Sequence, residues 1–192
     1  MPGAPLQKHK LVLEVSVAHV RVPIWRRVAV SSDTTLHDLA GALQIVLGWS
    51  PTDYTLIIEG KKYRGTEDGG SAVPIGLVMT AVGQRFAIER QGDVAWTYDV
   101  QYVGTVDDAE ATRPRCIDGQ GGVPTDEFGG LQQFRDFLDG QTDSSADLRQ
   151  WFREWKNEAE ERAGVWFHEF VIEETNDRLA AMRDEWPSVV DG

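Results

Sequence analysis

The sequence predicts an α+β protein, in which helices pack on an antiparallel sheet built from two hairpin units and a mainly helical part follows. Apolar and polar residues alternate as in half-buried strands at 10–18 and again at 94–103. Helical spacing of apolar residues occurs at 36–47 and is then concentrated after residue 131. Because strands and helices are grouped instead of strictly alternating, the pattern is that of α+β and not of a parallel α/β sheet.

The first two strands should form an antiparallel hairpin. Leucine and valine alternate with polar residues at 10–18, and a second strand at 24–30 follows a short bend. In this second strand the alternation places Arg26 on the apolar face and Trp25 and Arg27 on the opposite face. An arginine on the apolar face is the exception in an otherwise regular pattern.

A helix is predicted at 36–47, between clear start and stop signals. Thr35 followed by Asp38 resembles a capping box with aspartate in place of glutamate. Gly48 is a natural left-handed terminator, and Trp49 is placed to pack back on the last turn. With strands on both sides of this helix, residues 10–64 predict a β-β-α-β-β unit that resembles a β-grasp.

The middle of the chain predicts further strands joined by glycine-containing turns. The expected elements are a strand at 54–59, a short strand around Tyr63, a short helix at 75–82, and a second hairpin with arms at 85–90 and 94–103.

Residues 104–130 lack any periodicity and contain two glycine pairs, which predicts a long loop. Long loops in compact domains are functional or disordered. The elements expected after it are a helix at 131–138, a long helix at 146–163, an extended stretch at 165–172 and a last helix at 173–186. We therefore expect a flexible tail at 1–9, a single domain at 10–186 and a second tail at 187–192.

The composition is that of an ordinary globular protein, with 41% hydrophobic and 26% charged residues. No apolar run reaches the roughly 18 residues of a membrane span, and the first ten residues lack the apolar region of a secretory signal. Cys116 is the only cysteine, which excludes an intrachain disulfide. A cytoplasmic protein without a membrane contact is the expectation.

The net charge of −12 argues against general affinity for a phosphate backbone. The charge is unevenly distributed, since residues 1–64 hold eight basic and five acidic side chains, a net charge of +3. The remaining residues hold 11 basic and 26 acidic side chains, a net charge of −15. A contact with nucleic acid should therefore use the first third of the chain.

Four blocks of the sequence resemble the plasmid ORF-3-like family, in the order seen in that family. They are PIWRRVAV…TTLHDLAGALQIVLGW from Pro23 to Trp49, RFAIE…GD…WTYDV, RPRCIDGQGGVPTDEFGG and FHEFVIEETNDRL. The resemblance spans about residues 11–180 and implies an α+β fold, without bringing an established biochemical activity. Members of this family, which includes the ORF-3 protein of a root-inducing plasmid, also occur as passengers of insertion sequences under the label "TnpR".

The chain departs from this family at positions where relatives carry histidine and cysteine. The family has a His-x-His pair after the Gly-Trp, a histidine after the tryptophan of the second hairpin, and a second cysteine before the later Gly-Gly. This chain has Asp53 and Thr55, Tyr98, and Phe128 there. If relatives use these positions for a metal or for catalysis, this member lacks most of those ligands, which favours binding over chemistry.

The first candidate site is the segment 113–130. Asp118, Asp126 and Glu127 offer the hard oxygen ligands that suit calcium or magnesium, although acidic loop residues usually only meet water. Cys116 lies near Arg113 and Arg115, which would lower the pKa of a thiol, although a lone cysteine is more often a packed side chain. The sequence contains no phosphate loop, no nucleophile elbow and no metal-ligand spacing, so we expect no cofactor, no resident metal and no catalytic residue.

The second candidate site is a basic face. Arg26, Arg27, Lys61, Lys62 and Arg64 would converge if the first hairpin and the later strands were neighbours in one sheet. Together with Trp25 and Tyr63 they would form a surface of the kind that stacks single-stranded nucleic acid. The alternative is that Trp25 belongs to the core and that the arginines pair with acidic helices.

The sequence thus favours a non-enzymatic accessory or interaction module, associated with mobile elements and bound to a protein partner. The alternatives are a nucleic-acid-contacting factor that uses the basic face, and a metal-assisted hydrolase at 113–130.

Overall fold

The structure is a computed structural model that describes residues 10–20, 23–49, 53–64, 72–90, 96–107, 113–124, 130–132, 134–136, 167–168 and 170–185. The tails expected at 1–9 and 187–192 and the helix expected at 146–163 lie outside these residues.

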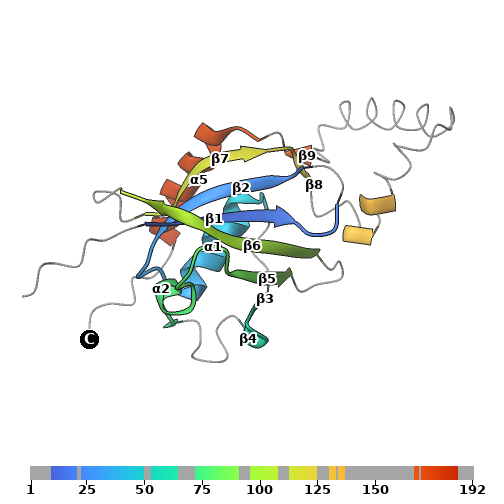
Figure 1. Ribbon diagram of the computed structural model, residues 1–192. Helices are drawn as coiled ribbons and strands as arrows, with labels where there is room; N and C mark the ends of the chain where they lie inside the picture. The colour runs from blue at the N-terminus through green and yellow to red at the C-terminus, as the bar shows by residue number, and fades with distance from the viewer. Residues whose placement is uncertain are drawn as a thin grey trace, which may run out of the picture.

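A seven-stranded antiparallel sheet organises the fold, with the strand order β4-β3-β5-β6-β1-β2-β7 (Figure 1). Its strands are β1 Lys10–Val17, β2 Trp25–Ser31, β3 Tyr54–Ile58, β4 Lys61–Arg64, β5 Arg85–Arg90, β6 Trp96–Val106 and β7 Arg115–Gln120. A separate pair joins β8 (Val123–Pro124) to β9 (Phe167–His168). The predicted α+β class is confirmed.

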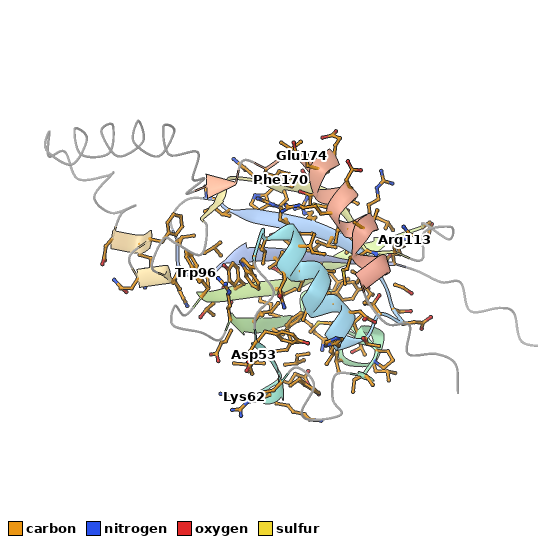
Figure 2. All side chains as sticks on the ribbon, turned by 180° about the vertical axis from the view of Figure 1, so that it is seen from behind. Asp53, Lys62, Trp96, Arg113, Phe170 and Glu174 are labelled. Atoms are coloured by element: carbon orange, nitrogen blue, oxygen red, sulfur yellow. The ribbon has the colours of Figure 1, made fainter. Side chains whose placement is uncertain are left out.

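Helices cover one face of this sheet, as the two opposite views show (Figures 1 and 2). Helix α1 (Leu36–Val46) lies across the strands, and α5 (Ile172–Glu185) lies beside α1 and next to the edge strand β7. Burial of apolar side chains between helices and sheet is the main force that holds these layers together. The core there includes Leu13, Val15, Val28, Leu39, Leu43 and Val100, all fully buried.

The two faces of the sheet follow from the alternation of side chains along each strand. We call the side against α1 the helix face; it carries Val15 and Val28. We call the opposite side the front face; it is turned toward the viewer in Figure 1 and carries Glu14, Arg27 and Gln101 as cross-strand neighbours. None of the helices α1, α2 and α5 lies on the front face.

The helix predicted at 36–47 is confirmed together with both of its ends. The Thr35 hydroxyl accepts a hydrogen bond from the Asp38 backbone amide at 3.1 Å and donates to the Asp38 carboxylate at 2.7 Å. At the other end Gly48 has φ +70°, and Trp49 N–H donates to Gln44 O at 2.9 Å, which is a Schellman cap. These local bonds explain why the sequence signals were sufficient here.

A short segment after residue 72 packs on the start of α1. Its helix, α2, runs only from Ile75 to Val78 and is shorter than the predicted 75–82. The Leu36 amide donates to Val73 O at 2.9 Å, and the Gly76 amide donates to Ser32 O at the same distance. A Cβ on Gly76 would lie 2.8 Å from the Ser32 Cβ, so this close approach requires glycine.

Both predicted hairpins form, but the sheet order does not confirm the β-grasp-like unit. Strands β5 and β6 lie between β1 and β3, so residues 10–64 contribute two separate parts of the sheet. The order of strands in space depends on long-range pairing, which the local pattern of residues 10–64 does not encode.

The expectation of a long loop at 104–130 is wrong. Strand β6 continues to Val106, and residues 115–120 form β7 at the sheet edge. The sequence of β7, RCIDGQ, shows no alternation and contains a single β-branched residue, so it carries no strand signal. Residues 131–132 and 134–136 are helical, in agreement with the helix predicted at 131–138. The last helix begins at Ile172, one residue before the predicted start.

No helix among the described residues is both long and apolar enough to cross a lipid bilayer.

Candidate functional site

Arg26 occupies the helix face of β2, where the alternation of the sequence predicted it. Its side chain is only 2% exposed. Nη1 donates to Trp25 O and Gln120 O at 2.8 Å each, and Nη2 donates to Gly121 O at 2.8 Å. The Phe170 ring covers the guanidinium, with 3.9 Å from Cζ to the ring centroid. Arg26 therefore ties the start of β2 to the end of β7 and to the chain that leads into α5.

Burial dominates the electrostatics of Arg26. It lowers the pKa of the guanidinium to about 10, partly offset by the neighbouring Cys116 thiol group. No carboxylate of the described chain pairs with this cation, and its buried Nε has no hydrogen-bond partner. An arginine that donates its hydrogen bonds to backbone carbonyls acts as a structural cross-link.

Cys116 is fully buried on β7, and its backbone is held by a side chain of α5. Cys116 N–H donates to Asn176 Oδ1 at 2.8 Å, and Asn176 Nδ2 donates to Cys116 O at 2.9 Å. Burial raises the pKa of the thiol to about 11, although Arg26 and a backbone hydrogen bond with Asp118 act in the opposite direction. Since the thiolate is the nucleophile, this cysteine is inert near neutral pH.

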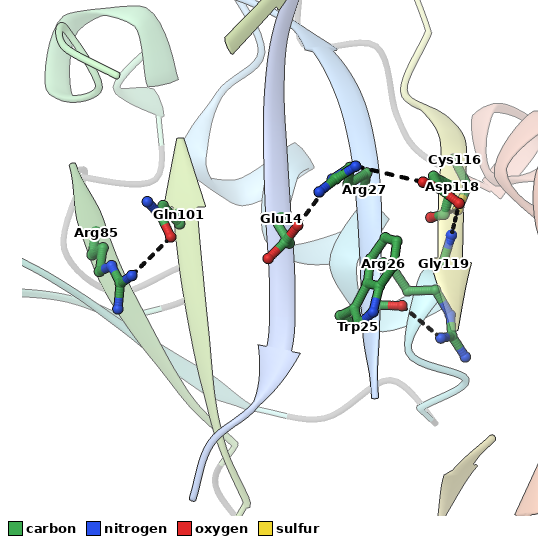
Figure 3. Close-up of polar contacts among 9 residues, drawn as sticks. All are labelled: Glu14, Trp25, Arg26, Arg27, Arg85, Gln101, Cys116, Asp118 and Gly119. Carbon is green, nitrogen blue, oxygen red and sulfur yellow. Dashed lines mark hydrogen bonds and ion pairs between the residues drawn. The ribbon is translucent and has the colours of Figure 1, made fainter. Parts of the chain in front are cut away.

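A β-bulge separates Cys116 from Asp118. The register pairs Val28 with Cys116 but Arg27 with Asp118, so Ile117 is the additional residue. Simple alternation would place both side chains on one face. With the bulge, Cys116 faces the core while Asp118 is exposed and lies within 3.5 Å of Arg27 on the front face (Figure 3).

The front face around β1, β2 and β7 carries a connected polar group. Arg27 Nε donates to Glu14 at 2.9 Å, and Arg27 Nη1 lies 3.5 Å from an Asp118 oxygen (Figure 3). The Arg27 guanidinium also lies over the half-buried Trp25 ring, 4.9 Å from the centroid. Exposed ion pairs contribute at most about 1 kcal/mol to stability, so the main effect of this network is to orient Arg27.

The two parts of the predicted basic face are not neighbours. Lys61, Lys62 and Arg64 lie on β4, and four strands separate β4 from β2. At about 4.8 Å per strand this is roughly 24 Å. Arg26 is in addition buried on the helix face, so the cations of β2 and β4 do not form one surface.

The residues predicted in the 113–130 segment are likewise divided. Arg113, Arg115 and Asp118 are exposed on or beside β7, and Cys116 is buried beneath them. Asp126 and Glu127 lie outside the described residues. Within the part of the chain that the structure describes, no group of three His, Cys, Asp or Glu side chains is placed to hold a metal ion.

Two positions singled out by the family comparison of the sequence point to different sides of the sheet. Thr55 on β3 pairs with Glu89 on β5, and Glu89 pairs in turn with Thr97 on β6. Tyr98 on β6 pairs with Ile88 and lies on the helix face. Adjacent positions 97 and 98 face opposite sides, so Thr55 and Tyr98 do too. Phe128 lies outside the described residues.

Sequence reasoning did not single out Asn176, Phe170 or Gly119. Asn176 and Phe170 are brought to β7 by the position of α5, for which the local sequence contains no signal. Gly119 is required by contact, because a Cβ there would lie 2.8 Å from both Arg26 Cδ and the Phe170 ring. Its place in a glycine-rich stretch was the one available hint.

The family model of the plasmid pRiA4b ORF-3-like protein matches residues 9–176. The chain belongs to the plasmid pRiA4b ORF-3-like family. The resemblance that the four sequence blocks indicated is thereby confirmed.

The fold is also similar to the crystal structure of MM3350, a protein of unknown function from Methanosarcina mazei Go1. The two share 17% sequence identity with a TM-score of 0.62, and the match covers 87% of this chain and 97% of that one. At this identity the likeness concerns the fold. A search of curated proteins gives no match.

Proposed function

We propose that this member of the ORF-3-like family is a non-enzymatic accessory module that binds another protein through its front face. The observation that carries the proposal is the ordered group of Trp25 and Arg27 between Glu14 and Asp118. Tryptophan and arginine are the residue types that dominate binding energy at protein interfaces. An arginine already held by two carboxylates loses little conformational freedom when a partner binds.

The positions of the reactive side chains support binding over chemistry. Cys116 has a raised pKa and a clamped backbone, and Arg26 uses its donors on carbonyls of the scaffold. Both residues stabilise the sheet end that presents Trp25 and Arg27. An association with mobile elements is a further part of the proposal and is supported by the family resemblance alone.

Affinity purification of the tagged full chain from its host, with and without nuclease, tests this function. We expect a protein partner that survives nuclease treatment with the wild type and is lost with the double variant Trp25→Ser, Arg27→Gln. Arg178→Glu on α5 is the control, because Arg178 is exposed on another element and its exchange should leave recovery unchanged. Circular dichroism melting would verify that each variant is folded.

Two outcomes would contradict the proposal. Recovery that nuclease abolishes would indicate a nucleic-acid partner, for which the exposed cations of β4 are the first residues to test. A reproducible metal-dependent turnover that is lost on exchange of Asp126 or Glu127 would indicate the hydrolase alternative.

A further inference from the structure

The free edge of β4 has backbone groups directed outward. The β3–β4 turn consists of Glu59 and Gly60 with φ of +51° and +78°, as in a two-residue hairpin, and Ile58 pairs with Lys61 across it. The pair that closes such a turn is hydrogen bonded, and bonded and non-bonded pairs alternate along the strands. Lys62 and Arg64 are in non-bonded pairs, so their N–H and C=O groups point away from β3.

At the opposite edge of the sheet, α5 closes β7 at Cys116. Asn176 of α5 bonds both the N–H and the C=O of Cys116, as a neighbouring strand would do. Among the described residues, β4 has only β3 as a partner, at the other margin of the sheet (Figure 1). Figure 2 shows Lys62 at the β4 margin, far from Arg113 and Phe170 beside α5.

A cavity of about 380 Å³ adjoins this edge on the helix face, between the β3–β4 hairpin and α2. The lining is mixed, because Ile58, Tyr63 and Leu77 stand beside the polar side chains of Glu59, Thr80 and Gln84. Leu77 is 72% exposed. Lys61 lies at the same wall, with Nζ 4.8 Å from the Tyr63 ring centroid. An apolar side chain entering here would cover Leu77, which is the most exposed large hydrophobic residue of the described chain.

The far wall of the cavity is preformed by Gln84. Its Oε1 accepts hydrogen bonds from the backbone amides of Thr80 at 2.6 Å and Ala81 at 2.8 Å. Its Nε2 donates to Glu59 at 3.3 Å, which connects the loop after α2 to the hairpin turn. These bonds hold Gln84 in place and connect two walls of the cavity.

Charge determines which kind of strand fits. Three of the four residues of β4 are exposed cations, Lys61, Lys62 and Arg64. A second copy pairing edge to edge would place these cations against one another, which is unfavourable. An acidic segment would instead be attracted to the same edge.

We propose that β4 is a strand-addition site for an extended acidic segment of another protein, with one apolar side chain of that segment seated in the cavity. In this mode the main-chain hydrogen bonds supply affinity and the alternate side chains supply specificity. This proposal rests on the proposed function, because both make the chain a binding module. The strand-addition site lies at β4, away from Trp25 and Arg27 on β2.

Edge lysines also protect a sheet against aggregation, and this reading accounts for Lys62 and Arg64 without any partner. It does not account for the cavity beside β4 or for the exposure of Leu77. The two readings differ in a measurable way, because protection alone predicts no saturable binding of a peptide.

Fluorescence polarisation with the full chain tests the site. The probe is a labelled eight-residue peptide that alternates glutamate with leucine, and the control peptide carries lysine in place of glutamate. We expect saturable binding of the acidic peptide only. The double variant Lys62→Glu, Arg64→Glu should weaken binding by about tenfold or more, because two attractive pairs become repulsive. Arg115→Glu is the matched control, since it reverses an exposed cation on the opposite edge strand and should change affinity by less than about twofold.

The variant Lys62→Pro tests the backbone contact itself. Proline is tolerated on an edge strand where its nitrogen faces away from the ladder, so the β3–β4 pairing is retained. It removes the outward donor together with the charge, while Lys62→Ala removes the charge alone. We expect Lys62→Pro to bind about fivefold more weakly than Lys62→Ala. Equal affinities would overturn the strand-addition geometry.

Absence of saturable binding at about 1 mM peptide would overturn the site as a whole. A protein partner that is recovered from the host and unaffected by the β4 variants would contradict this inference while leaving the proposed function intact. Binding of the acidic peptide without any protein partner at Trp25 and Arg27 would support this inference and contradict the proposed function.

Discussion

The two edges of the sheet differ in what completes their hydrogen bonding. At β7 the side-chain amide of Asn176 replaces a neighbouring strand, and α5, Arg26 and Phe170 cover the end of the strand. At β4 the outward backbone groups lie beside three cations and a cavity. The β7 edge is thus tied to α5 at the buried Cys116, whereas no described residue pairs with the outward groups of β4. The buried side chains of Arg26 and Cys116 lie at the first edge, and the cavity lies at the second.

The largest expected effect comes from opening the closed edge with Asn176→Leu. The variant leaves the buried N–H and C=O of Cys116 without partners, which costs about 2–4 kcal/mol of unfolding free energy. Urea unfolding followed by tryptophan fluorescence measures it. Asn176→Asp keeps the acceptor and loses the donor, so it should be destabilised less. An Asn176→Leu protein as stable as the wild type would show that the clamp is dispensable.

Gly119→Ala should have the next largest effect. The added Cβ would lie 2.8 Å from Arg26 Cδ and from the Phe170 ring, so the ring must move at a cost of about 1–3 kcal/mol. Combination with Phe170→Leu should recover part of that loss, which a double-mutant cycle of thermal unfolding would detect. Additive effects of the two exchanges would contradict the contact between them.

A smaller effect concerns the dependence of stability on pH. The pKa of the Cys116 thiol rises from 9.0 to about 11 on folding, so between these pH values the unfolded chain has lost the proton that the folded chain retains. Raising the pH through this window therefore favours unfolding. We expect the stability difference between the wild type and Cys116→Ala to narrow from pH 9 to pH 11. A difference that stays constant over this window would mean that the thiol is not held in its neutral form.

The smallest effect is expected at the open edge. Lys62→Thr changes an exposed side chain on β4 and should alter the unfolding free energy by less than about 0.5 kcal/mol. The same unfolding experiment as for Asn176→Leu provides the direct contrast between the edges. A loss of more than about 1 kcal/mol of unfolding free energy would indicate that β4, like β7, contributes to the stability of the fold.

The sequence predicted elements whose causes are local. The helix at 36–47 has its cap at Thr35 and its terminator at Gly48, and both act through bonds within a few residues. The alternation along β2 placed Arg26 on the helix face and Arg27 on the front face, and the structure confirms both. Four blocks of residues were also sufficient to indicate the family that the family model then confirmed.

The candidate sites could be predicted only as residue types, because their geometry depends on the strand order. The basic face required β2 and β4 to be neighbours, and four strands lie between them. The loop at 113–130 became an edge strand, and its bulge at Ile117 turned Cys116 and Asp118 to opposite faces. A bulge arises from pairing with β2, which the sequence of β7 alone does not reveal.

What the sequence by itself determined is the α+β class, the capped helix and the sidedness of β1 and β2, since propensity, capping and alternation act over a few residues. The tertiary structure alone decided that one edge is closed and the other open. Asn176 reaches Cys116 across 60 positions of the chain, because α5 packs beside α1 and against β7. Such a contact depends on how the layers fit together, and no local pattern around either residue specifies it.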